Sequence, residues 1–280
     1  MSGTLFLVAT PIGNLSDISA RAVKTLHDAD FIAAEDTRVT RKLLSYLNIK
    51  KQVISYREHN QHEVGFKIIS RLLNGESCAL VTDAGTPAIS DPGEDLVRLC
   101  RESNIKTIII PGPCAAIAGL ALSGLSSKSF IFEGFLPVDK KKRLVLLTQL
   151  QDENRTMVFY EAPHKLKRTL DDMLSIFGDR KISISRELTK IHEETLFLTI
   201  SEAIAHFNNV APRGEFVLVV EGSDLTLAHD DAINTAVKIA LSYISDGITT
   251  RDAIKRAATE TGCSRNELYK TIQGVFARLG

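Results

Sequence analysis

Tryptophan is absent from this sequence, and cysteine is rare, with four residues in 280. Neither sign of charge is in excess, since 34 lysines and arginines balance 34 aspartates and glutamates. A neutral protein has no global field that attracts nucleic acid, so any such partner has to meet a local basic patch. The cysteines form no CxxC pair. We therefore expect no metal site and no redox motif, in a reduced protein of the cytoplasm.

Long hydrophobic runs are missing as well. No run approaches the roughly 20 apolar residues that span a bilayer. The apolar start Leu5–Ala9 lacks the basic segment of a signal peptide. We expect no membrane partner, and a length of 280 residues allows two domains with a small third one.

Short apolar runs alternate with amphipathic segments through most of the chain. Helix-like segments such as Ser19–Asp28, Arg38–Leu47 and Val64–Leu73 separate many of the runs. This alternation predicts an α/β fold whose strands are buried on both faces. The runs expected to form strands are Leu5–Ala9, Phe31–Ala34, Ala79–Thr82, Thr107–Ile110, Ser129–Phe132, Thr156–Tyr160, Ile182–Ser185, Leu196–Ile200 and Phe216–Val220.

Two changes of pattern divide the chain, near Ser123–Ser127 and at Leu225. They predict an N-terminal α/β lobe over residues 1–122, a second α/β lobe over 123–224 and a helical domain over 225–280. The last region carries helical patterns at Asp230–Ser245, Thr250–Thr261 and Ser264–Leu279. A turn with Gly262 between the last two is typical of a helix-turn-helix, which often binds nucleic acid. A role in packing or dimerisation alone is the alternative.

Three loops rich in glycine, proline and alanine each follow an apolar run and lead into a helix: Ala9–Asn14, Asp83–Gly93 and Pro111–Ala116. Ligands of open α/β sheets lie outside the carboxyl ends of the strands, so the three loops are expected to line one crevice. Simple tight turns are the alternative. The chain has no P-loop motif and no GxGxxG after its first run, which disfavours a nucleotidase and a dinucleotide-binding enzyme.

Five motifs occur in order: TPIGNL at Thr10–Leu15, AEDTR at Ala34–Arg38, TDAGTPAISDPG at Thr82–Gly93, FEGFLP at Phe132–Pro137 and YEAPHK at Tyr160–Lys165. Together they resemble the tetrapyrrole methylase superfamily, the class III S-adenosylmethionine methyltransferases. Within it they resemble the ribosomal RNA small subunit methyltransferase I family over essentially the whole chain. The first loop departs from the Gly-x-Gly-Pro-Gly-Asp pattern of the porphyrin-methylating branch, which argues against a porphyrin-type substrate.

The resemblance implies a two-lobed fold with a small helical C-terminal domain. It implies transfer of a methyl group from S-adenosylmethionine to the 2′-hydroxyl of a cytidine ribose in 16S rRNA, leaving S-adenosylhomocysteine. The partners implied are the small ribosomal subunit and a second copy of the chain, as a homodimer. Alignment of the motifs places the donor between the lobes, in contact with Ile12, Asp83, Ala84, Gly85, Ala88, Cys114, Ala115, Tyr160, Leu188 and Pro212.

A ribose hydroxyl is a weak nucleophile at neutral pH, so a nearby carboxylate or imidazole is expected to accept its proton. The candidates are Glu35, Asp36 and His59, with Arg38 as a candidate phosphate contact. Helix capping is the alternative for the two acids, and a surface position is the alternative for His59. The basic residues Lys140–Arg143, Lys165, Lys167 and Arg168 are candidates for RNA contact or only for a solvated face.

Two other functions stay open at this point. One is a methylase of the same superfamily that acts on a tetrapyrrole-like small molecule. The other is a non-enzymatic helix-turn-helix regulator whose α/β part senses a nucleotide. The basic helices and the C-terminal helices favour RNA over a small substrate, and the complete set of donor loops favours an enzyme over a regulator.

Overall fold

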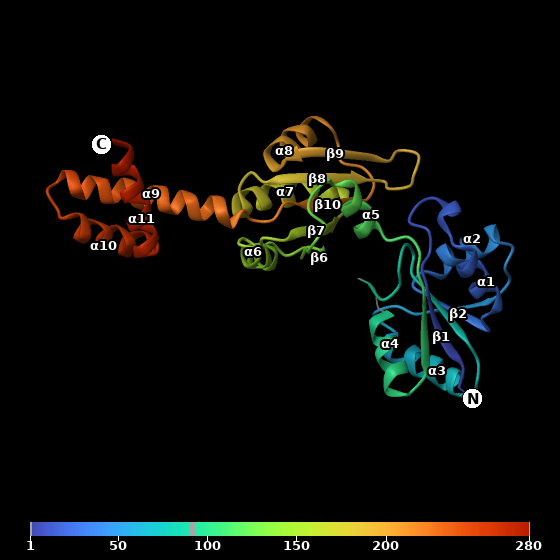
Figure 1. The fold of residues 1–280 in the computed structure, drawn as a ribbon. Coiled ribbons are helices and arrows are strands. Elements are labelled where there is room, and N and C mark those ends of the chain that lie inside the picture. Colours follow the sequence, from blue (N-terminus) through green and yellow to red (C-terminus); the bar gives the residue numbers. More distant parts are fainter. Residues whose placement is uncertain (1, 90–92, 280) are drawn as a thin grey trace. The chain divides into compact units, whose positions relative to one another are not determined.

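The computed structural model describes residues 2–89 and 93–279, with the backbone only at 225–232 and 275–279. The chain forms two compact units (Figure 1). The α/β unit comprises Met1–Gln151 and Arg155–Glu221, and the helical unit comprises Asp152–Asn154 and Gly222–Gly280. Ser90, Asp91 and Pro92 of the long predicted loop lie outside the described residues.

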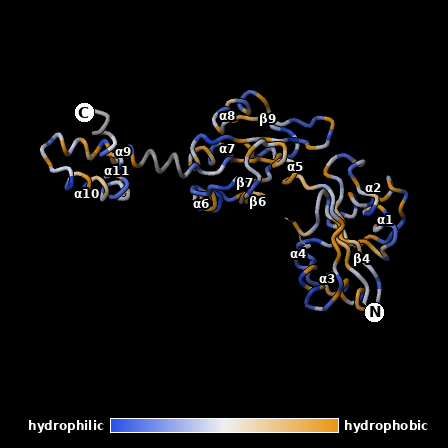
Figure 2. Tube along the Cα trace, in the orientation of Figure 1, coloured by the Kyte–Doolittle hydropathy of each residue, from blue (hydrophilic) through white to orange (hydrophobic). Residues whose placement is uncertain are grey.

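The first sheet of the α/β unit is parallel, in the strand order β3-β2-β4-β1-β5. Every residue of β2 and β4 is buried, and the strands at the centre of this sheet are mostly hydrophobic (Figure 2). Helices α3 and α4 contribute to the core on one face of the sheet, and α1 and α2 contribute to the core on the other. This arrangement confirms the expected α/β class. The strands are β1 (Thr4–Val8), β2 (Phe31–Ala34), β3 (Gln52–Ser55), β4 (Cys78–Val81) and β5 (Lys106–Ile110).

Before residue 123 the chain also forms a short 3-10 turn, η1 (Leu15–Asp17), and helix α1 (Ala20–Asp28). It continues with α2 (Thr37–Tyr46), α3 (Gln61–Leu73), α4 (Gly93–Glu102) and α5 (Ala115–Leu122). Side-chain caps fix two of the starts, since Ser19 accepts a hydrogen bond from the Ala22 amide and Asp36 accepts one from the Arg38 amide. Such caps satisfy amide groups that have no partner within the helix.

The second sheet has the strand order β6-β7-β10-β8-β9 and is mixed. Only β6 and β7 are parallel neighbours, and the other neighbours are antiparallel. The last strand in the sequence, β10, lies at the centre with all five residues buried. Helices α6, α7 and α8 share one large core with this sheet, while α5 packs on Val158, Val217 and Val219. The elements are β6 (Phe130–Phe135), α6 (Lys140–Gln149), β7 (Thr156–Glu161), α7 (Pro163–Phe177), β8 (Lys181–Arg186), β9 (Glu194–Thr199), α8 (Ile200–Asn209) and β10 (Phe216–Val220).

The helical unit contains α9 (Leu225–Ser245), α10 (Thr250–Thr261) and α11 (Arg265–Leu279). Ala236, Ala257, Leu268 and Ile272 are fully buried between them. Helix α10 ends at Gly262, whose φ of 72° is left-handed, a conformation that glycine adopts without strain. A helical C-terminal region was expected, although α9 begins five residues before the predicted Asp230.

The predicted strands agree with the observed ones to within three residues at each end, but β3 was missed. It is an edge strand of four residues, of which only Val53 and Ile54 are apolar. The domain boundaries at residues 122 and 224 stay a prediction. No described helix has the length and apolar character to cross a membrane.

Candidate active site

A cavity of about 420 Å³, here called the donor cavity, is lined by loops and strand ends of both sheets. Its volume lies within the range usual for small-molecule sites, about 300–1,000 Å³. Eight of the ten predicted donor contacts line it, while Ala88 and Pro212 do not. The eight are Ile12, Asp83, Ala84, Gly85, Cys114, Ala115, Tyr160 and Leu188.

The first two loops are held together by their backbones. The Thr10 amide donates to the Gly85 carbonyl at 2.9 Å, and the Gly85 amide donates to the Thr10 carbonyl at 3.0 Å. Gly85 has a φ of 84°, which favours glycine at this position. The pairing fixes the position of both loops at the carboxyl ends of β1 and β4.

The first loop also contacts the loop after β8. A Cβ on Gly13 would lie 2.5 Å from Lys190 Cγ, 2.9 Å from Thr189 Oγ1 and 3.0 Å from the Leu188 carbonyl oxygen. The Asn14 amide donates to Thr189 Oγ1 at 3.1 Å. Glu187 and Thr189 have positive φ angles of 50° and 66°, an uncommon conformation for residues with side chains. Glycine at position 13 is therefore required for the two lobes to meet at this side of the donor cavity.

Tyr160 forms a wall of the donor cavity. Its hydroxyl accepts a hydrogen bond from the Ala116 amide at 3.0 Å, and its ring meets Phe132 edge to face with centroids 5.0 Å apart. Burial raises the pKa of Tyr160 to about 12. The hydroxyl is therefore protonated at neutral pH, and the residue acts as a fixed surface at the first turn of α5.

A second cavity of about 790 Å³, here called the acidic cavity, adjoins the first. All four predicted catalytic residues, Glu35, Asp36, Arg38 and His59, line it. Two carboxylates, Glu35 and Asp83, line both cavities. A group in one cavity and a group in the other would therefore meet at these two side chains. The acidic cavity is also lined by Arg57, Glu58, Gln61, Glu94 and Asp95.

The register of the parallel sheet brings the two motifs together. Strands β2 and β4 are neighbours, with Ala34 beside Val81. One residue further along each strand, Glu35 and Thr82 are joined by a hydrogen bond from Thr82 Oγ1 to Glu35 Oε2 at 2.8 Å. Asp36 and Asp83 come next, and the Asp36 amide donates to Asp83 Oδ1 at 3.0 Å. Adjacent strands thus place AEDTR directly against TDAG.

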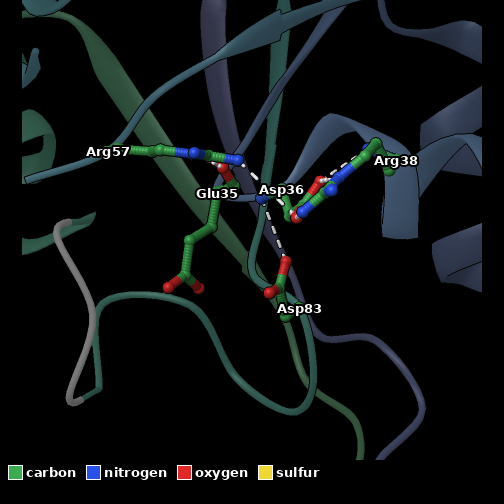
Figure 3. A network of polar contacts seen from close by, with 5 residues as sticks. All are labelled: Glu35, Asp36, Arg38, Arg57 and Asp83. Atoms are coloured by element: carbon green, nitrogen blue, oxygen red, sulfur yellow. Dashed lines mark hydrogen bonds and ion pairs between the residues drawn. The ribbon is translucent and has the colours of Figure 1, made fainter.

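Asp36 is engaged by its own helix and by Arg57, whose Nη2 lies 3.6 Å from Asp36 Oδ2. The Asp36 side chain caps α2 and accepts hydrogen bonds from the Arg38 amide at 2.8 Å and from Arg38 Nη2 at 2.6 Å (Figure 3). These hydrogen bonds hold the pKa of Asp36 far below its usual range. A carboxylate of that kind is a poor proton acceptor, so the geometry favours the capping alternative for Asp36.

Glu35 is differently placed. Figure 3 shows its carboxylate directed away from the Asp36–Arg38 pair. Thr82 donates to Oε2, while Oε1 has no hydrogen-bond partner among the described residues. Its main chain is held by Arg57 Nε, which donates to the Glu35 carbonyl at 2.7 Å. Partial burial, followed by the charge of Glu35, raises the pKa of the neighbouring Asp83.

Sequence reasoning missed several residues of these cavities. Thr82 stands next to Asp83 in the long motif, so its position was available, but its hydrogen bond to Glu35 depends on strand order. Arg57 follows β3, which was itself missed. The acidic residues Glu161, Glu187 and Glu215 and the base Lys190 also line the donor cavity. Lys190 Nζ bonds to Glu187 at 2.9 Å and to Glu215 at 3.1 Å.

One member of the predicted basic patch is not available to a partner. Arg143 is 3% exposed. Its Nη2 lies 2.7 Å from Asp172 on α7 and its Nη1 donates to the carbonyls of Pro137 and Val138. It is a structural residue that ties α6 to α7, whereas Lys140, Lys141 and Lys142 are exposed.

In the part of the chain that the structure describes, no group of three or more His, Cys, Asp or Glu side chains is placed to hold a metal ion. The expectation that no metal is needed stays a prediction.

Comparison with known proteins agrees with this architecture. The family model of Tetrapyrrole (Corrin/Porphyrin) Methylases matches residues 4–204. The chain is 46% identical over 270 residues to the ribosomal RNA small subunit methyltransferase I of Halalkalibacterium halodurans, covering 95% of this chain and 93% of the relative. It is 47% identical to the protein of the same name from Thermotoga maritima over 222 residues, which are 79% of this chain and all of the relative. A crystal structure of diphthine synthase has the same fold, with a TM-score of 0.61, 15% identity and coverage of 79% and 90%.

Proposed function

The chain belongs to the tetrapyrrole methylase family and, within it, to the ribosomal RNA small subunit methyltransferase I family, and from this membership we propose that it methylates 16S rRNA at the 2′-hydroxyl of a cytidine ribose. The methyl donor in this proposal is S-adenosylmethionine. The observation that carries it is the junction of two cavities at Glu35 and Asp83. One cavity has the size and small-residue lining for the donor, and the other is open enough for a nucleotide.

The donor cavity fits S-adenosylmethionine in shape and charge. Ala84, Gly85 and Ala115 leave room for a flat group, and Tyr160 and Leu188 offer apolar surface. Carboxylates outnumber the single lysine of its lining, which suits a ligand with a sulfonium and an ammonium group. When bound, the donor supplies an activated methyl group, so the protein has to bind and orient its two substrates.

Glu35 is our candidate for the proton acceptor. The reaction removes a proton from the ribose hydroxyl as the new bond to carbon forms, and a carboxylate oxygen with no other partner accepts it. Glu35 Oε1 lies at the junction of the cavities and has no hydrogen-bond partner in the part of the chain that the structure describes, and Thr82 and Arg57 hold the residue in place. His59, exposed on the rim of the acidic cavity, is the second candidate.

Asp36 and Arg38 are assigned a supporting role. Asp36 holds the start of α2 and orients Arg38, whose guanidinium remains largely exposed. An exposed guanidinium beside the acidic cavity is suited to a backbone phosphate of the RNA. Ala88 and Pro212 stay predicted donor contacts that would require movement of their loops. Homodimerisation and action in the cytoplasm belong to the proposal as well.

The decisive measurement is mass spectrometry of 16S rRNA from cells with and without the gene. We expect one nucleotide to lose 14 mass units (one CH₂), and alkaline hydrolysis to cleave after it only in the mutant, since a 2′-O-methyl group blocks that cleavage. Loss of a base methyl instead would refute the ribose assignment. An unchanged 16S rRNA together with methylation of a small molecule would support the tetrapyrrole alternative, and the absence of any methyl transfer would support the regulator.

A further inference from the structure

Helix α11 presents a continuous solvent-exposed face over its first nine residues. Its members are spaced i, i+1, i+4, i+5 and i+8, which places them on one side of a helix. The other side of the same segment carries Leu268 and Ile272, both fully buried in the helical unit. The exposed residues, here called the α11 face, are Arg265, Asn266, Tyr269, Lys270 and Gln273.

The α11 face has the chemistry of a nucleic-acid contact. It contains two cations, two amides and a tyrosine that is 51% exposed, and no acid. Neither Arg265 nor Lys270 forms a salt bridge or hydrogen bond with any residue that the structure describes. The neighbouring helix differs, because Arg256 of α10 lies over the Tyr243 ring and Tyr243 bonds to Glu260. Arg265 and Lys270 are therefore available, whereas Arg256 of α10 is engaged within the unit.

The helical unit is separate from the chemistry of the active site. Every residue that lines the donor cavity or the acidic cavity belongs to the α/β unit. The relative from Thermotoga maritima is matched over its entire length and leaves 58 of the 280 residues of this chain unmatched. A unit that contributes no residue to either cavity is expected to affect how substrate is held and to leave the reaction itself intact.

We propose that the α11 face binds RNA of the small ribosomal subunit outside the active site. Arg265 and Lys270 contact backbone phosphates, and Tyr269 stacks on an unpaired base. Phosphate contacts supply affinity that falls with salt, and stacking on tyrosine is a common way to hold single-stranded RNA. The identity of the RNA rests on the proposed function. A second copy of the chain fits less well, because the face offers only one large apolar side chain and its two like charges would repel their copies.

The test is the steady-state methylation of small ribosomal subunits by the full-length protein. We expect Lys270→Gln to raise KM for subunits about fivefold to tenfold and to lower the slope of log KM against log salt by about one. Adding Arg265→Gln is expected to repeat both effects. Tyr269→Ala is expected to raise KM about fivefold or more without changing the slope. The turnover number kcat and the donor affinity should stay within twofold of the wild type.

A matched control is Lys238→Gln, which removes the same charge from an exposed position of α9 in the same unit. We expect its KM to stay within twofold. Equal KM values for Lys270→Gln, Tyr269→Ala and wild type at low salt would overturn the α11 proposal while leaving the proposed function intact. A rise in KM accompanied by a change in oligomeric state would overturn it in favour of self-association. A wild-type protein that methylates no RNA would refute the proposed function, and with it the premise of this proposal.

Discussion

Replacing Glu35 by Gln tests the central step of the proposed reaction. The amide keeps the size of the side chain and an oxygen that accepts the hydrogen bond from Thr82 Oγ1, at 2.8 Å in the native protein. The hydrogen bond from Arg57 Nε goes to the main-chain carbonyl of residue 35 and is untouched. The variant is therefore expected to fold with nearly the same stability and to lose only the ability to accept a proton.

The expected loss follows from the part that a proton acceptor plays in the transition state. A positioned general base contributes about 10²–10⁴-fold, and removal of an interaction made only in the transition state lowers kcat and kcat/KM together. We expect Glu35→Gln to lower kcat at least about 100-fold. The Kd for the donor should change by less than about tenfold, since one of several carboxylates around the donor cavity loses its charge.

The assay combines single-turnover methylation of small ribosomal subunits at saturating donor with calorimetry of donor binding. Two control variants use other carboxylates of the acidic cavity. Glu58→Gln removes an exposed carboxylate that does not line the donor cavity. Asp36→Ala removes the α2 cap and the partner of Arg38. It is expected to lower the melting temperature and to reduce turnover less than Glu35→Gln does. A Glu35→Gln protein with a rate within threefold of the wild type would refute the assignment and direct attention to His59.

Three further predictions concern the cavities and the core. Gly85→Val is expected to lower donor affinity at least about 100-fold and to cost about 1–3 kcal/mol of stability, because a branched residue would have to adopt the φ of 84°. Gly85→Ala, whose Cβ meets Ile12 Cγ2 at an ordinary 3.5 Å, should lose less affinity and less stability. Equal donor affinities for the Val, Ala and Gly proteins would contradict the loop assignment. The pKa of Asp83 is raised above the usual value for aspartate, and a cationic donor prefers the ionised carboxylate, so donor affinity should increase as the pH rises through that pKa. Calorimetry with a chelator present should give the same dependence of donor affinity on pH, and Asp83→Asn should flatten it. Arg143→Met should destabilise the α/β unit in urea by about 3–5 kcal/mol, since it leaves Asp172 without its buried partner. A second change, Asp172→Leu, should recover most of the lost stability, and an unchanged urea midpoint for Arg143→Met would refute the structural role of this pair.

Local sequence was sufficient to predict the strands that are apolar throughout. β2, β4 and β10 are buried on both faces, so their sequences are continuous hydrophobic runs. β3 has one neighbouring strand and is only half-buried, which leaves a pattern too weak to recognise. The loops after β1, β4 and β5 were found because their small residues follow such runs directly.

The contacts between AEDTR and the loop after β4 were not available from local sequence. Glu35 contacts Thr82 and Asp36 contacts Asp83 because β2 lies next to β4, although 47 residues separate the members of each pair. Nothing in either motif specifies that neighbour. The same holds for Arg143, which stands in a run of lysines but is buried because Asp172 reaches it from α7. The residue types indicated the chemistry, and the strand order determined which of them act together.

The central place of β10 has a consequence for synthesis of the protein. The chain is made from its N-terminus, and Phe216–Val220 is the last strand of the second sheet to be made, yet it separates β7 from β8. Until those residues leave the ribosome, the β8–β9 hairpin cannot join β6 and β7, and the donor cavity lacks the wall that Phe216 and Val217 provide. Contacts this distant in sequence form late in folding. A nascent chain therefore contains all five strands of its first sheet well before the donor cavity is complete, and the proposed binding of the donor becomes possible only with the final strand.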